Sequence, residues 1–265
     1  MIRNLAFILP FLAASPALAA SSQWQTSEGG SVRIVTSGLP DDDGRLHGAL
    51  DIKLKPGWKT YWRNPGPSGI PPSIDLSRSP HIKSAELAFP APVRVHDGDT
   101  QWAGYKQSVR LPVTFTLDRA DVVTLIDVDV FLGICETICI PFQASFSFDP
   151  GSGADDQSDA FAVQMAHAAL PSPATGTFGV NAVSRSGSML TLDANLPQDT
   201  SNPELFIDHE KSHLFGTPTL VKQGSGTAEF AVEIHEASDD GLAESSLRYT
   251  LVANGRSVSG AIDIP

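Results

Sequence analysis

The two cysteines are the residues whose type and spacing most directly suggest chemistry. Cys135 and Cys139 stand four positions apart in the mostly apolar segment FLGICETICIPF, and no other cysteine occurs among the 265 residues. One pair is too few for a tetrahedral zinc site, which takes four ligands. The spacing also differs from the C-x-x-C of thioredoxin-like active sites. The pair therefore indicates a disulfide or a dithiol.

The geometry of an extended chain limits how these cysteines can pair. In a continuous strand, residues four positions apart share a face but lie about 13 Å apart at ~3.3 Å per residue. A disulfide requires Cα atoms within roughly 4.4–6.8 Å of each other. Either Cys135 and Cys139 never bond to each other, or the chain turns sharply at residues 136–138. In the second case, residues 128–132 and 140–144 would form a hairpin with the cysteines near its tip.

A disulfide in so small a ring is poorly suited to a structural role. Closing a short loop removes little entropy from the unfolded chain, so the bond would stabilise the fold only slightly. Strained or exposed disulfides are the labile or catalytic ones. The position of the pair suits a two-electron redox centre better than a stabilising cross-link. A structural disulfide and two buried thiols remain open as alternatives.

The charges near the pair refine its expected role. Glu136 lies between the cysteines, and no Lys or Arg occurs in residues 131–142. A nearby negative charge disfavours a thiolate. We therefore expect a disulfide that a partner's thiolate attacks, or a dithiol that attacks slowly until it has docked.

The first residues predict export. Arg3 precedes the apolar stretch LAFILPFLAA, which is too short to span a bilayer. Small residues at Ala17 and Ala19 then form a cleavage site. We predict a signal peptide at residues 1–19, cleaved near Ala19, and a soluble exported chain thereafter. An oxidising export compartment makes two nearby cysteines a disulfide candidate.

The remaining composition and motifs exclude several functions. The net charge of −12 disfavours nucleic acid and anionic membrane surfaces as partners. No later apolar segment approaches the ~20 residues of a membrane span, and no glycine-rich phosphate loop or G-x-S-x-G motif occurs. His209 and His213 lie four apart but lack the H-E-x-x-H order, which favours a surface loop over a metal site. We expect no metal and no cofactor.

Most of the sequence has the two-residue alternation of half-buried strands. Gly- and Pro-rich turns separate these segments, as is typical of antiparallel sandwiches. A polar stretch and a helix-like segment interrupt them at residues 151–176. The sequence predicts an all-β protein of two tandem immunoglobulin-like β-sandwich domains, residues 20–150 and 177–265, joined by this linker with a short helix.

The expected helix runs from residue 158 to residue 170. Ser158 can cap its start, and Pro171 ends it. The residues that helical periodicity places on one apolar face are Phe161, Met165, Ala168 and Ala169.

Aromatic residues cluster near a rigid loop at residues 64–72, which is rich in proline and glycine. Trp is most often a packing residue, which favours a sandwich core for Trp58. Part of this loop could instead shield the disulfide from stray thiols until a partner displaces it. The candidates for shielding or docking are Trp58, Tyr61, Trp62, Trp102 and Tyr105.

Taken together, three segments resemble one family. VFLGICETICIPF, residues 130–142, resembles the cysteine segment of the N-terminal periplasmic (alpha) domain of DsbD/ScsB-type thiol:disulfide interchange proteins, the ScsB-like branch being closer. The resemblance covers about residues 24–149 strongly and the second half more loosely. The two supporting segments are GWKTYWRNPG at 57–66 and the run that combines Phe-Pro-Ala-Pro at 89–92, Gly-Tyr at 104–105 and Leu-Pro-Val at 111–113.

The resemblance implies an immunoglobulin-like sandwich that carries Cys135 and Cys139 as a catalytic pair. Such domains pass reducing equivalents between a membrane-embedded thiol relay and periplasmic thioredoxin-like proteins, in processes such as cytochrome c biogenesis and copper tolerance. Full members continue into a membrane domain and a thioredoxin-like domain, so we expect a stand-alone soluble chain whose membrane partner is a separate protein. The expected activity is that of a protein-disulfide reductase acting on protein partners.

An alternative of another class stays open. A non-catalytic β-sandwich binding module, or a Cu(I)-binding copper-tolerance protein, would keep the cysteines as structure or as soft ligands, since thiolates suit Cu(I). A Cys135→Ala/Cys139→Ala double variant would lose all exchange in the first case. In the second case it would lose only stability or Cu(I) affinity.

Overall fold

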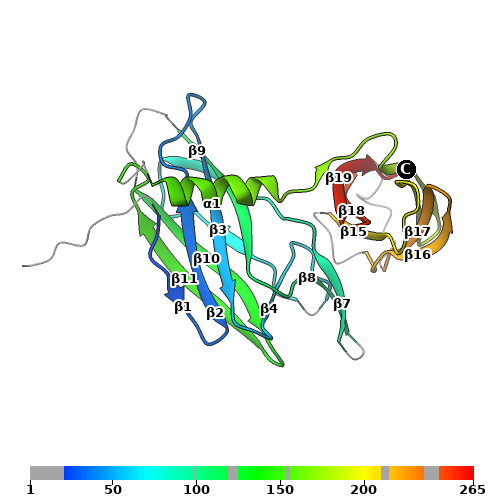
Figure 1. The fold of residues 1–265 in the computed structure, drawn as a ribbon, viewed down its shortest axis with the longest axis horizontal. Coiled ribbons are helices and arrows are strands. Elements are labelled where there is room, and N and C mark those ends of the chain that lie inside the picture. The colour runs from blue at the N-terminus through cyan, green and yellow to red at the C-terminus, as the bar shows by residue number, and fades with distance from the viewer. Residues whose placement is uncertain are drawn as a thin grey trace, which may run out of the picture.

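The computed structural model describes residues 21–67, 69–97, 100–118, 125–152, 156–209, 215–235 and 245–265. The predicted signal peptide and His213 lie outside these ranges. Two groups of sheets follow one another along the chain and lie side by side, the C-terminal group at the right of Figure 1. We call strands β1–β11 the first domain and strands β12–β19 the second domain. Within the described ranges, no helix has the length and apolar character that a membrane crossing requires.

Two antiparallel sheets form the first domain. One has the strand order β1-β2-β3-β9-β6, and the other has the order β11-β10-β4-β8-β7, with β5 also paired to β10. The first sheet consists of β1 (Gln25–Thr26), β2 (Gly30–Thr36), β3 (Arg45–Leu54), β6 (Ile82–Leu87) and β9 (Val109–Leu117). The second consists of β4 (Lys59–Tyr61), β5 (Ser73–Asp75), β7 (Val93–Asp97), β8 (Thr100–Tyr105), β10 (Ile126–Cys135) and β11 (Cys139–Phe148).

Two four-stranded sheets form the second domain. Their strand orders are β12-β19-β18-β15 and β13-β14-β17-β16, and β12 runs parallel to β19. The first of these sheets consists of β12 (Ser172–Pro173), β15 (Glu204–Asp208), β18 (Ser246–Ala253) and β19 (Arg256–Asp263). The second consists of β13 (Gly179–Ser186), β14 (Met189–Asn195), β16 (Thr219–Gly224) and β17 (Thr227–Glu233).

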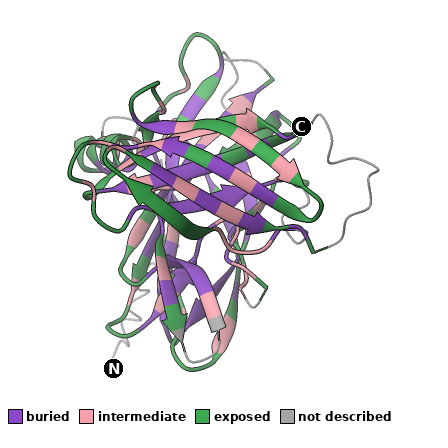
Figure 2. Cartoon of the chain, turned by 90° about the vertical axis from the view of Figure 1, so that its right-hand side faces the viewer, coloured by how far each residue is buried: buried purple, intermediate pink, exposed green. Residues whose placement is uncertain are grey.

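Each core lies between the two sheets of its domain. Figure 2 shows buried and exposed positions alternating along the strands, as the sequence periodicity predicts. In β11, for example, Phe142 and Phe146 are buried whereas Gln143 and Ser145 are exposed. The predicted all-β fold of two tandem immunoglobulin-like β-sandwich domains with one short helix between them is confirmed.

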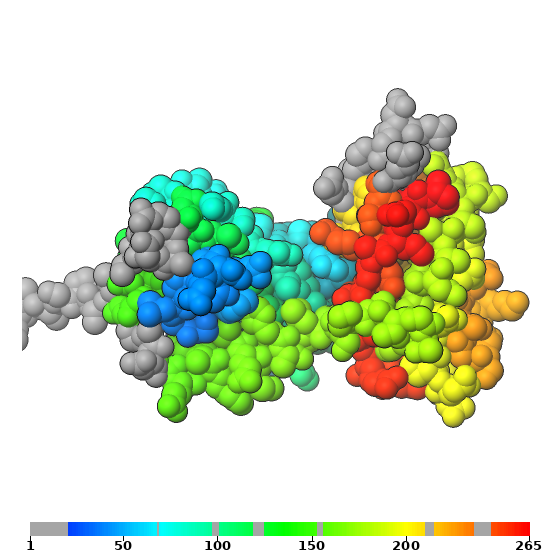
Figure 3. Space-filling model, turned by 90° about the horizontal axis from the view of Figure 1, so that it is seen from above, coloured from blue at the N-terminus to red at the C-terminus, as the bar shows by residue number. Residues whose placement is uncertain are grey.

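Helix α1 (Gln157–Ala168) packs against β2, β3 and β9. Figure 3 shows it as a green surface along the first domain. Its N-cap is Asp156, whose carboxylate accepts hydrogen bonds from the backbone N–H groups of Ser158 and Asp159. The predicted cap at Ser158 was therefore wrong. An Asp two residues earlier fills the same role, because its side chain reaches both free N–H groups.

The predicted apolar face of this helix is not the face that packs. Phe161 and Met165 are 62% and 48% exposed. The buried face instead carries Ala162, Val163 and Ala166. These small side chains allow the helix to approach the sheet closely. The prediction from periodicity alone favoured the larger apolar residues instead.

Asp159 fixes the helix to β2 inside this contact. Its buried carboxylate accepts hydrogen bonds from Ser21 Oγ (2.6 Å) and Arg33 Nη2 (3.0 Å). Hydrogen bonds to charged groups contribute about 1.5–3 kcal/mol, so Asp159→Ala should lower the free energy of unfolding by about 2 kcal/mol in urea denaturation. Gln164→Ala, at an exposed position of the same helix, should leave it unchanged. Equal losses in the two variants would contradict this role.

Candidate redox site

The two cysteines close the tip of a hairpin. β10 ends at Cys135, β11 begins at Cys139, and the two residues face each other in the register of the hairpin. The turn between them is closed by a hydrogen bond from the Glu136 N–H to the Ile138 carbonyl oxygen (3.3 Å). The Cα atoms lie 4.1 Å apart and the sulfurs form a disulfide. Of the two alternatives that the spacing allowed, the sharp turn is the one observed.

The two cysteines differ in exposure. Both lie on the outer face of the sheet, because their strand neighbours Ile134 and Ile140 point toward the sandwich core. Cys135 is only 1% exposed, whereas Cys139 is half-buried and follows the exposed Ile138. Cys139 is therefore the sulfur that an incoming thiolate reaches more easily.

A small apolar cluster covers the disulfide. Tyr61, Val95 and Trp102 are buried with Cys135, and Ile70 packs against them together with Cys139. The Tyr61 and Trp102 rings meet edge to face, with centroids 5.8 Å apart. We call Tyr61, Ile70, Val95 and Trp102 the cover. Its members come from β4, the loop after β4, β7 and β8, so distant parts of the chain enclose one bond.

The Tyr61 hydroxyl is the polar group of the cover that meets the sulfurs. Its oxygen lies 2.9 Å from Cys139 Sγ and 3.2 Å from Cys135 Sγ. Because disulfide sulfurs carry no proton, the hydroxyl is the donor in this contact. In the reduced state the same hydroxyl can donate to a thiolate, and such charge-assisted bonds are stronger.

The structure separates the five aromatic candidates into two groups. Tyr61 and Trp102 belong to the cluster that holds the disulfide, whereas Trp58, Trp62 and Tyr105 pack inside the core of the first domain. The Tyr105 hydroxyl donates to the carbonyl oxygen of Pro90 (2.8 Å), and burial raises its pKa well above the ordinary value.

The proline-rich loop contributes to the cover through Ile70. The Gly133 N–H donates to the Ile70 carbonyl oxygen (3.2 Å), which fixes the loop over β10. A Cβ at Gly133 would lie 2.9 Å from Ile70 Cβ and 3.0 Å from the Tyr61 ring, so only glycine permits this approach. The predicted loop thus includes a residue of the cover, although the sequence did not single out Ile70 or Val95.

Lys59 is a charged neighbour that the local sequence did not reveal. It pairs with Cys135 across β4 and β10, and its ammonium nitrogen lies 4.8 Å from the centroid of the Trp102 ring. A cation beside a cysteine favours the thiolate, which opposes the effect expected of Glu136. Only the pairing of strands that lie far apart in sequence places this charge there.

Comparisons with known proteins agree with this architecture. Residues 33–150 match the family model described as thiol:disulfide interchange protein DsbD, N-terminal, and residues 169–264 match a domain of unknown function, DUF8393. The crystal structure of the N-terminal periplasmic domain of ScsB from Proteus mirabilis is similar over 92% of this chain and 99% of that chain, with a TM-score of 0.74 and 23% identity. No curated protein matches the chain. The resemblance seen in the sequence is confirmed, by the family model over residues 33–150 and by the fold over both domains.

Replacing Tyr61 tests the contact between its hydroxyl and the sulfurs. Tyr61→Phe keeps the ring in the cover but removes the donor to a Cys139 thiolate. We expect the thiol pKa of the reduced pair to rise by about one unit, which corresponds to ~1.4 kcal/mol. The ultraviolet absorbance of the thiolate, followed against pH, measures it. Tyr105→Phe is the matched control, because that hydroxyl binds Pro90 instead. An unchanged thiol pKa in Tyr61→Phe would contradict the assignment.

Proposed function

We propose that this chain is a periplasmic thiol:disulfide exchange protein that acts as a protein-disulfide reductase. Cys135 and Cys139 would relay reducing equivalents between a separate membrane-embedded thiol relay protein and thioredoxin-like partners. The observation that carries this proposal is a disulfide at the tip of a hairpin beneath an apolar cover. The family match over residues 33–150 supports thiol:disulfide exchange in general.

The position of the disulfide argues against a purely structural role. β10 and β11 already pair over ten residue pairs, so the cross-link at their end closes only the short turn between them. Short loops gain little stability from cross-linking. The surrounding side chains nevertheless bury Cys135 and leave Cys139 partly accessible, an arrangement that limits the access of thiols.

Exchange would begin at Cys139. A partner's thiolate attacks Cys139 Sγ, a partner–Cys139 disulfide forms, the Cys135–Cys139 bond breaks, and Cys135 leaves as a thiolate beside Lys59. The partner's second thiolate then attacks the partner sulfur of the mixed disulfide and releases Cys139. Two electrons pass to the pair, and the partner dithiol becomes a disulfide. The reduced pair reduces the next partner's disulfide by the same steps in reverse.

The proposal includes the remaining sequence-based assignments. Residues 1–19 would direct export, residues 20–150 would form the redox domain, and residues 177–265 would follow the linker at 151–176. The end of β11 at Phe148 agrees with the first limit, whereas β12 (Ser172–Pro173) lies within the proposed linker and already pairs with β19 of the second domain.

Single-cysteine variants test which sulfur is attacked. Cys135→Ala leaves the half-buried Cys139, whose thiolate should readily displace thionitrobenzoate from a thioredoxin-like protein that lacks its second active-site cysteine and carries the first as a mixed disulfide with thionitrobenzoate. Cys139→Ala leaves only the buried Cys135 and should form little mixed disulfide with this protein. Mass spectrometry of the trapped species measures both, and the double variant is the control without exchange. Preferential trapping through Cys135 would contradict the proposed order.

The reduction potential tests the redox role itself. We expect the pair to equilibrate at about −180 to −270 mV, the range of exchange proteins. Equilibration in glutathione or dithiothreitol buffers, followed by thiol trapping and mass spectrometry, gives the value. A potential below about −300 mV is typical of structural disulfides and would refute the relay.

A further inference from the structure

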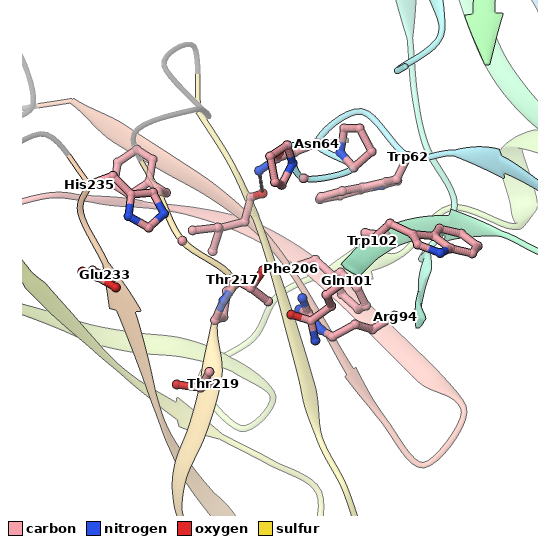
Figure 4. A pocket seen from close by; sticks show the side chains of 18 of the residues that line it. Trp62, Asn64, Arg94, Gln101, Trp102, Phe206, Thr217, Thr219, Glu233 and His235 are labelled. Atoms are coloured by element: carbon pink, nitrogen blue, oxygen red, sulfur yellow. Dashed lines mark hydrogen bonds between the residues drawn. The ribbon is translucent and has the colours of Figure 1, made fainter. Parts of the chain in front are cut away.

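The second domain contacts the first through β15, the edge strand of its sheet. An edge strand pairs with a neighbouring strand on one side only, so the sheet provides no partners for the backbone N–H and C=O groups on its other edge. Two side chains of the first domain bind carbonyl oxygens of β15. Asn64 Nδ2 donates to the Ile207 oxygen (2.8 Å), and Arg94 Nη2 donates to the Leu205 oxygen (2.6 Å). The carbonyl groups of Leu205 and Ile207 point to the same edge of the strand, and Figure 4 shows Asn64 and Arg94 one after the other along that edge.

The side chain of Phe206 in β15 packs in the core of the first domain rather than in that of its own domain. Its neighbours Leu205 and Ile207 fill the core of the second domain, whereas Phe206 packs with the core of the first and is 2% exposed. The Trp62 ring meets it edge to face at 5.8 Å, and the guanidinium carbon of Arg94 lies 4.6 Å from its centroid. At this contact the two domains therefore share part of a hydrophobic core and do not meet only at their surfaces.

Ion pairs flank this shared core. Arg63 Nε lies 3.4 Å from the buried Asp208 carboxylate, which Arg248 also binds. Arg94 Nε lies 3.8 Å from a Glu204 carboxylate oxygen. Burial lowers the pKa of Arg94, and Glu204 counteracts this shift. Charges withdrawn from water in this way resist separation more than exposed pairs do.

The residues that meet β15 are chain neighbours of the cover. Trp62 follows Tyr61 directly, and Arg94 precedes Val95. Successive side chains of an extended chain point to opposite sides. The same stretches of backbone thus present one residue to the disulfide and the next to the second domain. A shift of either stretch would move both contacts.

A cleft of about 360 Å³ lies between the two domains beside this contact. Gln101 and Trp102 line it from the first domain, and Thr217, Glu233 and His235 line it from the second (Figure 4). Trp102 is also part of the cover. The cleft therefore adjoins the strand that carries Trp102, whose ring points away from the cleft in Figure 4 and packs in the cover.

We infer that the second domain, through β15, holds the cover closed over the Cys135–Cys139 disulfide, with Arg94 and Phe206 as positioning residues. The inference rests on the proposed function, because a closed cover matters only for a disulfide that exchanges. The second domain would thereby influence the chemistry of the first. Residues next to the cover in the sequence contact β15, and these contacts determine how often a thiol can reach the sulfurs.

The test is the rate at which dithiothreitol reduces the disulfide in the native full-length chain, followed by thiol trapping and mass spectrometry. Arg94→Ala and Phe206→Ala each remove part of the contact. Each should accelerate reduction about tenfold, within the ~5- to 150-fold that coupling between sites usually spans. Phe206→Leu keeps an apolar side chain at the contact and should restore most of the protection.

Two matched controls separate loss of the β15 contact from side-chain truncation elsewhere. Val221→Ala shortens an exposed apolar side chain of the second domain, and Arg78→Ala removes an exposed ion pair with Asp129. Neither residue belongs to the cover or to the β15 contact, so both variants should be reduced at the unaltered rate. Thermal unfolding identifies the folded variants, and Arg94→Ala decides the outcome if Phe206→Ala does not fold. Unchanged rates in the contact variants, or equal acceleration in the controls, would overturn the inference.

The quantity measured in this experiment does not depend on the proposed function. No partner protein takes part, and the measured quantity is access to the sulfurs. A reduction potential in the structural range would refute exchange yet leave the accelerations measurable. Acceleration confined to the controls would refute positioning yet leave exchange untouched.

Discussion

A disulfide that closes a three-residue turn cannot be enclosed by its own hairpin, and the rest of the first domain depends on this constraint. Cys135 and Cys139 must lie at the tip of β10 and β11, where neither strand has further residues to fold over them. Their side chains also face away from the sandwich core. Protection has to come from elsewhere, and the structure provides it with Tyr61, Ile70, Val95 and Trp102.

A short strand of the cover contributes both to the surroundings of the disulfide and to the contact with the second domain. β4 has only three residues, yet it pairs with both β10 and β8. Lys59 and Tyr61 of this strand lie on the side of the disulfide, and the stretch that follows them leads to Asp208 and Ile207 of the second domain. A segment this short has little stability of its own. Its position therefore depends on partners on both sides, which is why a contact with the second domain can influence the sulfurs.

The sequence predicted the features that local pattern and distance determine. Alternation along strands gave the two sandwiches, and the incompatibility of a straight strand with a disulfide reduced the choice to unbonded cysteines or a turn at residues 136–138. It did not predict Lys59 beside Cys135 or Val95 in the cover, because these neighbours depend on which strands pair across long stretches of sequence. The face of α1 was also missed. Its orientation follows from Asp159 and the small Ala162 and Ala166, whereas hydrophobic periodicity favours the larger Phe161 and Met165.

A cover changes which thiols can react without changing the chemistry of the bond. If the cover is open for about one molecule in a hundred, attack by a stray thiol is slowed about a hundredfold, because only the open fraction is competent. A partner whose docking favours the open form by ~2.7 kcal/mol recovers that factor. Cys139 then reacts quickly with a protein that makes contacts beyond the sulfur and slowly with a small thiol that makes none. Discrimination of this kind requires a cover that is stable but not permanent, and burial of Phe206 between the domains adds stability from outside the redox domain.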